Sequence, residues 1–149
     1  MTIAGFTFTR MLVERKSQAK GAVDINSNIG VVSAEEIDFV MGQTKQKGIK
    51  VLFDYRNTYT PDLGVLILNG EILYLSDQKR HDGLMKSWKK DKKFPDDVMI
   101  ELYNIISVRG ALQSIQLSST VGLPPPIPLP KFTKGQTQQQ QQQSKGEKG

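Results

Sequence analysis

The chain has 149 residues, a formal net charge of +5 and no cysteine. That length favours one domain with an appendage over two domains, and the lack of cysteine excludes disulfides and thiolate metal sites. The longest apolar run, residues 65–68, is far shorter than the ~20 residues of a membrane helix, and the opening residues contain no apolar leader segment. We therefore expect a soluble protein of the reducing cytoplasm.

The positive charge is concentrated near the C-terminus. Residues 1–130 contain 16 Lys and Arg against 14 Asp and Glu, whereas residues 131–149 contain four Lys and one Glu. The second segment also carries six consecutive glutamines, and such a composition cannot build a packed core. The sequence predicts one folded domain at residues 1–130 and a disordered, basic polyglutamine tail at residues 131–149.

Two segments with alternating apolar and polar residues open the chain. Residues 6–13 begin with the sequence FTFT and predict a strand with one buried face, and residues 19–32 alternate in the same way. The next stretch, residues 33–41, begins with SAEE, which resembles a helix N-cap followed by early acids, but it is too short to define a helix.

A β-hairpin is the clearest prediction. Residues 48–59 place Ile49, Val51, Phe53 and Tyr55 on one parity, so they predict a strand. The sequence TPDLG follows and supplies turn chemistry, because Pro fixes φ, Asp bonds to the backbone and Gly tolerates positive φ. Residues 65–75 then predict the second strand, with a bulge or bend at its Asn-Gly pair.

Two helices follow the hairpin. Residues 81–93 predict a short amphipathic helix, and residues 95–109 a longer one with acids at its positive end and apolar residues on one face. The Arg109-Gly110 pair is typical of a helix C-terminus, since Gly favours the C′ position. Residues 123–130, LPPPIPLP, then predict an extended apolar arm that lies across the domain or a neighbouring subunit.

The sequence offers little for catalysis. His81 is the only histidine and stands in a polar segment, so we expect it to be an exposed surface residue. Asp96 and Asp97 follow a proline at a helix start, where acids usually cap the helix rather than bind metal. The glycines lack the spacing of a phosphate-binding loop. We therefore expect no enzyme activity, no cofactor and no metal.

A basic cluster in the short helix is the best candidate for nucleic-acid binding. Its lysines could neutralise phosphates while its tryptophan stacks on a base. The alternative is an amphipathic helix whose tryptophan packs inward and whose lysines remain solvated. The cluster consists of Lys86, Trp88, Lys89, Lys90, Lys92 and Lys93.

The apolar residues after Gly110 exceed what a small core readily buries. Either subunits associate through one face, or an apolar groove is open to partners.

The order of these elements resembles SecB, the bacterial chaperone family that holds unfolded preproteins for export. The opening FTFTRM (residues 6–11) is similar to the family's first strand, and the hairpin at residues 51–75 stands where its central strands would be. The run IISVRG (residues 105–110), followed by apolar residues and prolines, resembles the end of the family's long helix and its crossover. The proline arm suggests a distinct SecB-like branch, such as an archaeal one.

The resemblance implies an α+β fold, in which one long and one short helix pack on one face of a four-stranded antiparallel sheet with a proline-rich crossover arm. It also implies a dimer or homotetramer that binds unfolded or nascent polypeptides without ATP. The client groove would lie between the sheet and the crossover. By position, its lining would be Phe53, Tyr55, Leu112, Ile115, Leu117, Leu123, Ile127 and Leu129.

Three functional hypotheses follow. The first is a holdase chaperone of the SecB type, linked through the resemblance to protein export. The second is an RNA- or ribosome-associated protein that uses residues 86–93 and the basic tail. The third is a structural or regulatory subunit whose proline arm docks on a fixed partner. The family docks on its export motor through an acidic surface, which the basic tail does not supply, so we do not expect delivery to that motor.

Overall fold

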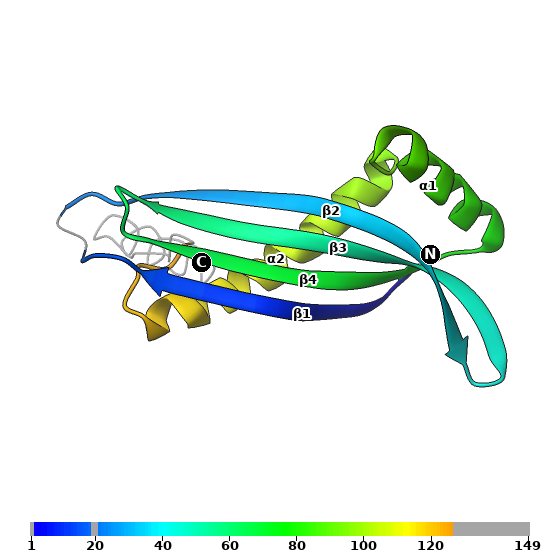
Figure 1. Cartoon of the computed structure of the whole chain (residues 1–149), viewed down its shortest axis with the longest axis horizontal. Helices are drawn as coiled ribbons and strands as arrows, with labels where there is room; N and C mark the ends of the chain where they lie inside the picture. Colours follow the sequence, from blue (N-terminus) through cyan, green and yellow to red (C-terminus); the bar gives the residue numbers. More distant parts are fainter. Residues whose placement is uncertain (1, 19–20, 127–149) are drawn as a thin grey trace, which may run out of the picture.

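The computed structural model describes residues 2–18 and 21–126 of the chain, and the predicted tail lies outside them. These residues form a four-stranded antiparallel sheet in the order β1-β4-β3-β2, with two helices (Figure 1), which confirms the predicted α+β class. The elements are β1 (Thr2–Arg15), β2 (Asp24–Met41), β3 (Thr44–Thr60), β4 (Gly64–Leu75), α1 (Gln78–Asp91) and α2 (Asp96–Thr120).

The central hairpin of β3 and β4 is confirmed. Their pairing runs from Ile49 opposite Tyr74 to Tyr59 opposite Gly64, and buried residues alternate with half-buried ones along both strands. The irregularity predicted at Asn69-Gly70 of β4 is present at that place, but the extra residue is in β1: Phe8 pairs with Gly70 and Arg10 with Asn69, so the register shifts between them.

The prediction that the second strand ends near residue 32 is wrong, because β2 continues to Met41. A register shift between Val31 and Ser33 inserts one extra residue, so the inward parity changes from Ile29 and Val31 to Ala34 and Glu36. That change of phase hides the alternation in the sequence. From Ile37 onward, β2 pairs with β3 past the end of β4, and Figure 1 shows this extension as a projecting hairpin.

The long helix also ends later than predicted, since α2 continues through Gly110 to Thr120. The glycine that ends it is Gly122, which has φ +75°. The Leu123 N–H donates to the Ser118 carbonyl (2.9 Å) and the Gly122 N–H to the Ser119 carbonyl (3.3 Å), as in a Schellman motif. The predicted chemistry of the helix end was therefore right, but it belongs to a different glycine.

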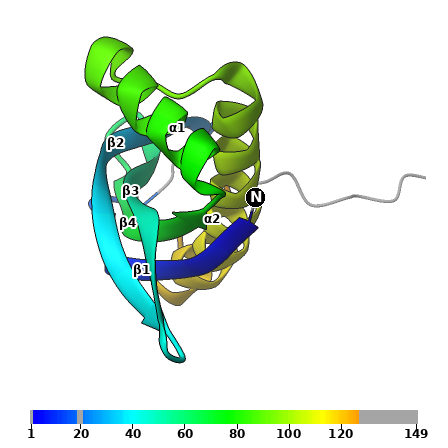
Figure 2. The same cartoon turned by 90° about the vertical axis from the view of Figure 1, so that its right-hand side faces the viewer.

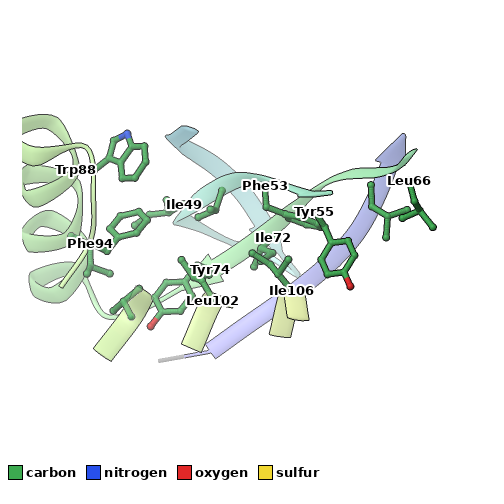
Figure 3. Close-up of a cluster of buried hydrophobic side chains, with 14 of the residues drawn as sticks. Ile49, Phe53, Tyr55, Leu66, Ile72, Tyr74, Trp88, Phe94, Leu102 and Ile106 are labelled. Carbon is green, nitrogen blue, oxygen red and sulfur yellow. The ribbon is translucent and has the colours of Figure 1, made fainter. Parts of the chain in front are cut away.

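Helix α2 runs across one face of the sheet, and α1 packs at one end of it (Figure 1 and Figure 2). The core beneath them joins Phe53, Tyr55, Ile72 and Tyr74 of the central strands to apolar residues of the helices (Figure 3). The buried residues of α2 recur at every fourth position, and they change from large and apolar to small and polar along the helix. In order they are Val98, Leu102, Ile106, Gly110, Ser114 and Ser118.

Candidate functional site

The outward side of α2 carries a row of exposed apolar residues. Ile100, Val108 and Leu112 are 59%, 61% and 66% exposed, and Tyr103 beside them is 36% exposed. The first three are spaced by multiples of four residues, as the buried series is, so their row runs along the opposite side of the helix. These four residues are named the apolar ridge below.

The apolar ridge lies on a helix with very little charge. Between Leu102 and Thr120, Arg109 is the only charged residue. Its guanidinium carbon lies 5.1 Å from the ring centroid of Phe6, so this cation is directed at β1 and not outward with the ridge. Surface helices of soluble domains usually present charged and polar residues to water. The outward side of α2 instead exposes several large apolar side chains and little charge.

Half-buried apolar residues continue this surface onto the edge strands. On β1, the Phe6 ring lies 5.1 Å from that of Phe8 and 4.9 Å from that of buried Phe53, while Met11 is 45% exposed. On β2, residues of the inward parity such as Ile29 pack against the core without being fully covered. The helix and both edge strands thus share one apolar side of the domain.

A buried polar network fixes the C-terminal half of α2 on the sheet. Asn57 of β3 is fully buried, and its Nδ2 lies 3.4 Å from Ser114 Oγ and 3.5 Å from Tyr55 Oη. Ser27 of β2 donates to its Oδ1, and Ser114 in turn donates to the Gly110 carbonyl at 2.6 Å. Because each of these contacts is made by a small or polar group, this half of α2 lies close to the sheet.

The residues predicted to line a client groove are divided between the core and the surface. Phe53 and Tyr55 are buried beneath α2, and Leu123 is only 6% exposed, so these three act as core residues. Leu112 belongs to the apolar ridge. Ile115 and Leu117 are half-buried on α2, and Ile127 and Leu129 lie outside the described residues. With α2 packed on the sheet, the predicted lining residues that the structure describes do not meet in one groove.

Three residues of the ridge were missed in the sequence: Ile100, Tyr103 and Val108. The predicted helix end at Gly110 separated them from Leu112, although they belong to the same helix. The sequence did contain a signal for these residues. A nearly uncharged helix in which apolar residues recur at multiples of four positions on two opposite sides is typical of a helix with both sides covered.

Trp88 of the basic cluster is not available for base stacking. It is 7% exposed and packs on Phe94, with 5.1 Å between ring centroids (Figure 3). The lysines of the cluster are exposed. The structure thus matches the amphipathic alternative for this helix, while RNA or ribosome binding by the lysines stays a prediction.

The prediction that His81 is exposed is wrong, because its side chain is 1% exposed. Helix α1 begins earlier than predicted and places His81 on the same face as Leu84, Met85 and Trp88. His81 Nε2 lies 2.7 Å from Glu36 Oε2, and Lys47 Nζ lies 3.1 Å from Glu36 Oε1. The hydrogen bond to His81, followed by that to Lys47, holds the pKa of Glu36 below its usual value. This contact ties α1 to the hairpin of β2 and β3.

Neither a metal cluster nor a membrane span is found in the described part of the chain. Residues 2–18 and 21–126 contain no group of three or more His, Cys, Asp or Glu side chains placed to hold a metal ion. Neither helix there is long and apolar enough to cross a membrane.

Comparison with known proteins gives a likeness of fold to solved structures. No family model matches the sequence, and no curated protein matches it. Among solved structures, the chain is similar to a SecB-like chaperone of Mycobacterium tuberculosis, determined in complex with a peptide from an antitoxin. The two share 12% sequence identity, with a TM-score of 0.46, and the likeness covers 88% of this chain and 90% of that one.

Proposed function

We propose that the protein is an ATP-independent chaperone that holds unfolded or nascent polypeptides on the apolar side formed by α2 and the edge strands. The observation that carries this function is the apolar ridge, a row of exposed Ile, Val, Leu and Tyr on a helix with one charge between Leu102 and Thr120. A chain that fails to fold exposes apolar side chains of its own, and burying them against the ridge removes both surfaces from water.

The chemistry of this surface suits clients of varied sequence. Each apolar side chain that passes from water into a contact contributes about 1.5–3 kcal/mol when it is fully buried, and less on an open ridge. Contacts of this kind are not directional, so they favour tolerance over specificity. The binding free energy comes from burial, so the holding step itself needs no nucleotide.

A second copy of the chain is the other occupant that the ridge would accept, and we propose self-association as part of the same function. Ser107 and Ala111 lie on α2 between ridge residues, and small side chains there would allow another helix to approach closely. The client and the second copy would then either compete for the same apolar side or bind different parts of it. Linkage to protein export does not follow from these contacts.

The experiment that tests the holding function measures the aggregation of a chemically denatured protein by light scattering, without nucleotide. We expect the full chain to suppress aggregation and the Val108→Glu/Leu112→Glu variant to lose most of that effect. Glu retains high helix propensity, so α2 should still form. Thr7→Glu, at an exposed position of β1, adds a charge away from the ridge and should suppress aggregation like the unmodified chain.

Two results would contradict this function. One is no suppression by the unmodified chain. The other is full suppression by the double variant after circular dichroism has shown that it is folded. In the second case the ridge would not bind clients, and self-association would be its one remaining proposed role.

A further inference from the structure

The folded domain is electrically divided. Residues 79–93 contain seven Lys and Arg and two Asp, a net charge of +5, while the rest of residues 1–130 contains nine Lys and Arg and twelve Asp and Glu, a net charge of −3. The positive segment is almost entirely α1, which lies at one end of the sheet (Figure 1). A near balance over the whole domain therefore conceals a concentrated positive field.

Three lysines of α1 border a shallow depression between this helix and β2. Lys86, Lys89 and Lys90 line it together with Met85, and its volume is about 510 Å³. Lys86 and Lys90 are one helical turn apart, about 6 Å along the axis. Among the described residues these three lysines form no ion pair, whereas three lysines of the loops and strands do.

Two acids, Glu36 and Asp82, also line this depression, but among the described residues neither forms an ion pair with the three lysines, and each has another partner. Glu36 binds His81 and Lys47 at 2.7 Å and 3.1 Å. Asp82 accepts a hydrogen bond of 2.8 Å from Gln78 Nε2. The cluster thus has three ammonium groups with unused donors beside the buried apolar side chain of Met85.

We infer that this depression is a docking site for an acidic segment of a partner polypeptide. Carboxylates of the partner bind Lys86, Lys89 and Lys90, and an apolar partner residue packs toward Met85. The site is separate from the apolar ridge on α2, so it does not depend on the chaperone function.

Two observations favour an acidic polypeptide over a nucleic acid. Trp88, the one tryptophan of the cluster, is turned into the core against Phe94 and cannot stack on a base. Glu36 and Asp82 stand at the depression and repel a continuous phosphate backbone. Discrete carboxylates on a flexible peptide can place themselves at the lysines and avoid both acids.

The test is fluorescence anisotropy of a short, labelled peptide of Glu, Leu and Gly titrated with the full chain. A peptide with Gln in place of Glu reports binding through Leu alone, and an oligo-uridylate of equal length reports nucleic-acid binding. The variant Lys86→Gln/Lys89→Gln/Lys90→Gln removes the site. The control Arg15→Gln/Lys45→Gln/Arg56→Gln removes the same charge at exposed positions away from it.

We expect the acidic peptide to bind, its affinity to fall with added salt, and the lysine variant to bind at least about tenfold more weakly, which is about 1.4 kcal/mol. The charge-matched control should bind within about twofold of the unmodified chain.

Three results would overturn the site. One is an equal loss of affinity in the lysine variant and in the charge-matched control, because binding would then depend only on net charge. Tighter binding of the oligo-uridylate, or equal binding of the Gln peptide, would also overturn it. A normal interaction of the lysine variant with an unfolded, uncharged client shows that the ridge is unaffected.

Discussion

Gly110 of α2 lies directly on the aromatic ring of Tyr55. A Cβ atom at position 110 would lie 2.6 Å from Cδ2 of that ring, and both residues are buried. The glycine therefore marks a close approach of the helix to the sheet, in the middle of α2 and not at its end.

Gly110→Ala should destabilise the domain. Forcing a methyl group into this contact costs about 1–3 kcal/mol, which outweighs the gain of about 1 kcal/mol that Ala brings to a helix interior. The Tyr55 ring cannot easily retreat, because it is buried and its hydroxyl is in the Asn57 network. Urea unfolding measures the change.

The matched control is Gly83→Ala in α1, where a Cβ atom meets nothing within 4 Å. There we expect a gain of about 0.5–1 kcal/mol, since only the helix propensity changes. Stabilisation by both substitutions would show that α2 does not press on Tyr55.

Stability at acid pH should depend on Glu36. Its pKa is lowered in the folded state, so its contribution is present above the ordinary value of 4.5 and is lost as the pH falls below it. Glu36→Gln should therefore make the urea midpoint less sensitive to pH below about 4.5. Glu14→Gln removes an exposed glutamate of β1 without touching this contact. Identical pH profiles of Glu36→Gln and the unmodified chain would refute the contribution.

The single tryptophan offers a test of the core beneath α1. Because Trp88 is buried against Phe94, its emission should be blue-shifted in the folded protein and move to longer wavelength on unfolding. Oligo-uridylate should leave this emission unchanged. A red-shifted native spectrum, or quenching by the oligonucleotide, would place the indole at the surface.

Self-association should depend on the apolar ridge. In sedimentation velocity experiments, the unmodified chain should form dimers or larger species as its concentration rises, and Val108→Glu should shift this equilibrium toward monomer. A charge at this position would be buried in every copy that associates, which is costly without a partner of opposite charge. Thr7→Glu should behave as the unmodified chain. Association that is unaffected by Val108→Glu would place the interface elsewhere.

The sequence predicted correctly those elements in which the spacing of apolar residues is uninterrupted. The hairpin of β3 and β4 followed from strict alternation around Pro61, and the acids at the start of α2 marked its N-terminus. The failures have particular causes. The register shift after Val31 changed the phase of β2, and Gly110 carried a helix-end signal that its contact with Tyr55 explains instead.

The candidate surface was only partly predictable. Leu112 was identified as apolar and accessible, but its position on a continuous helix was not, because the end of α2 was placed too early. His81 needed the contact with Glu36, a residue 45 positions away, before it could be assigned to the interior. Contacts of that separation depend on tertiary packing, which local periodicity does not report.

The most direct test of the central claim is the fluorescence anisotropy of a labelled, permanently unfolded polypeptide titrated with the full chain at low and high salt, without nucleotide. We predict saturable binding that survives high salt, is lost in Val108→Glu/Leu112→Glu, and is unchanged in the lysine variant of α1. No binding, or binding that high salt abolishes, would contradict a holdase that works through apolar contacts.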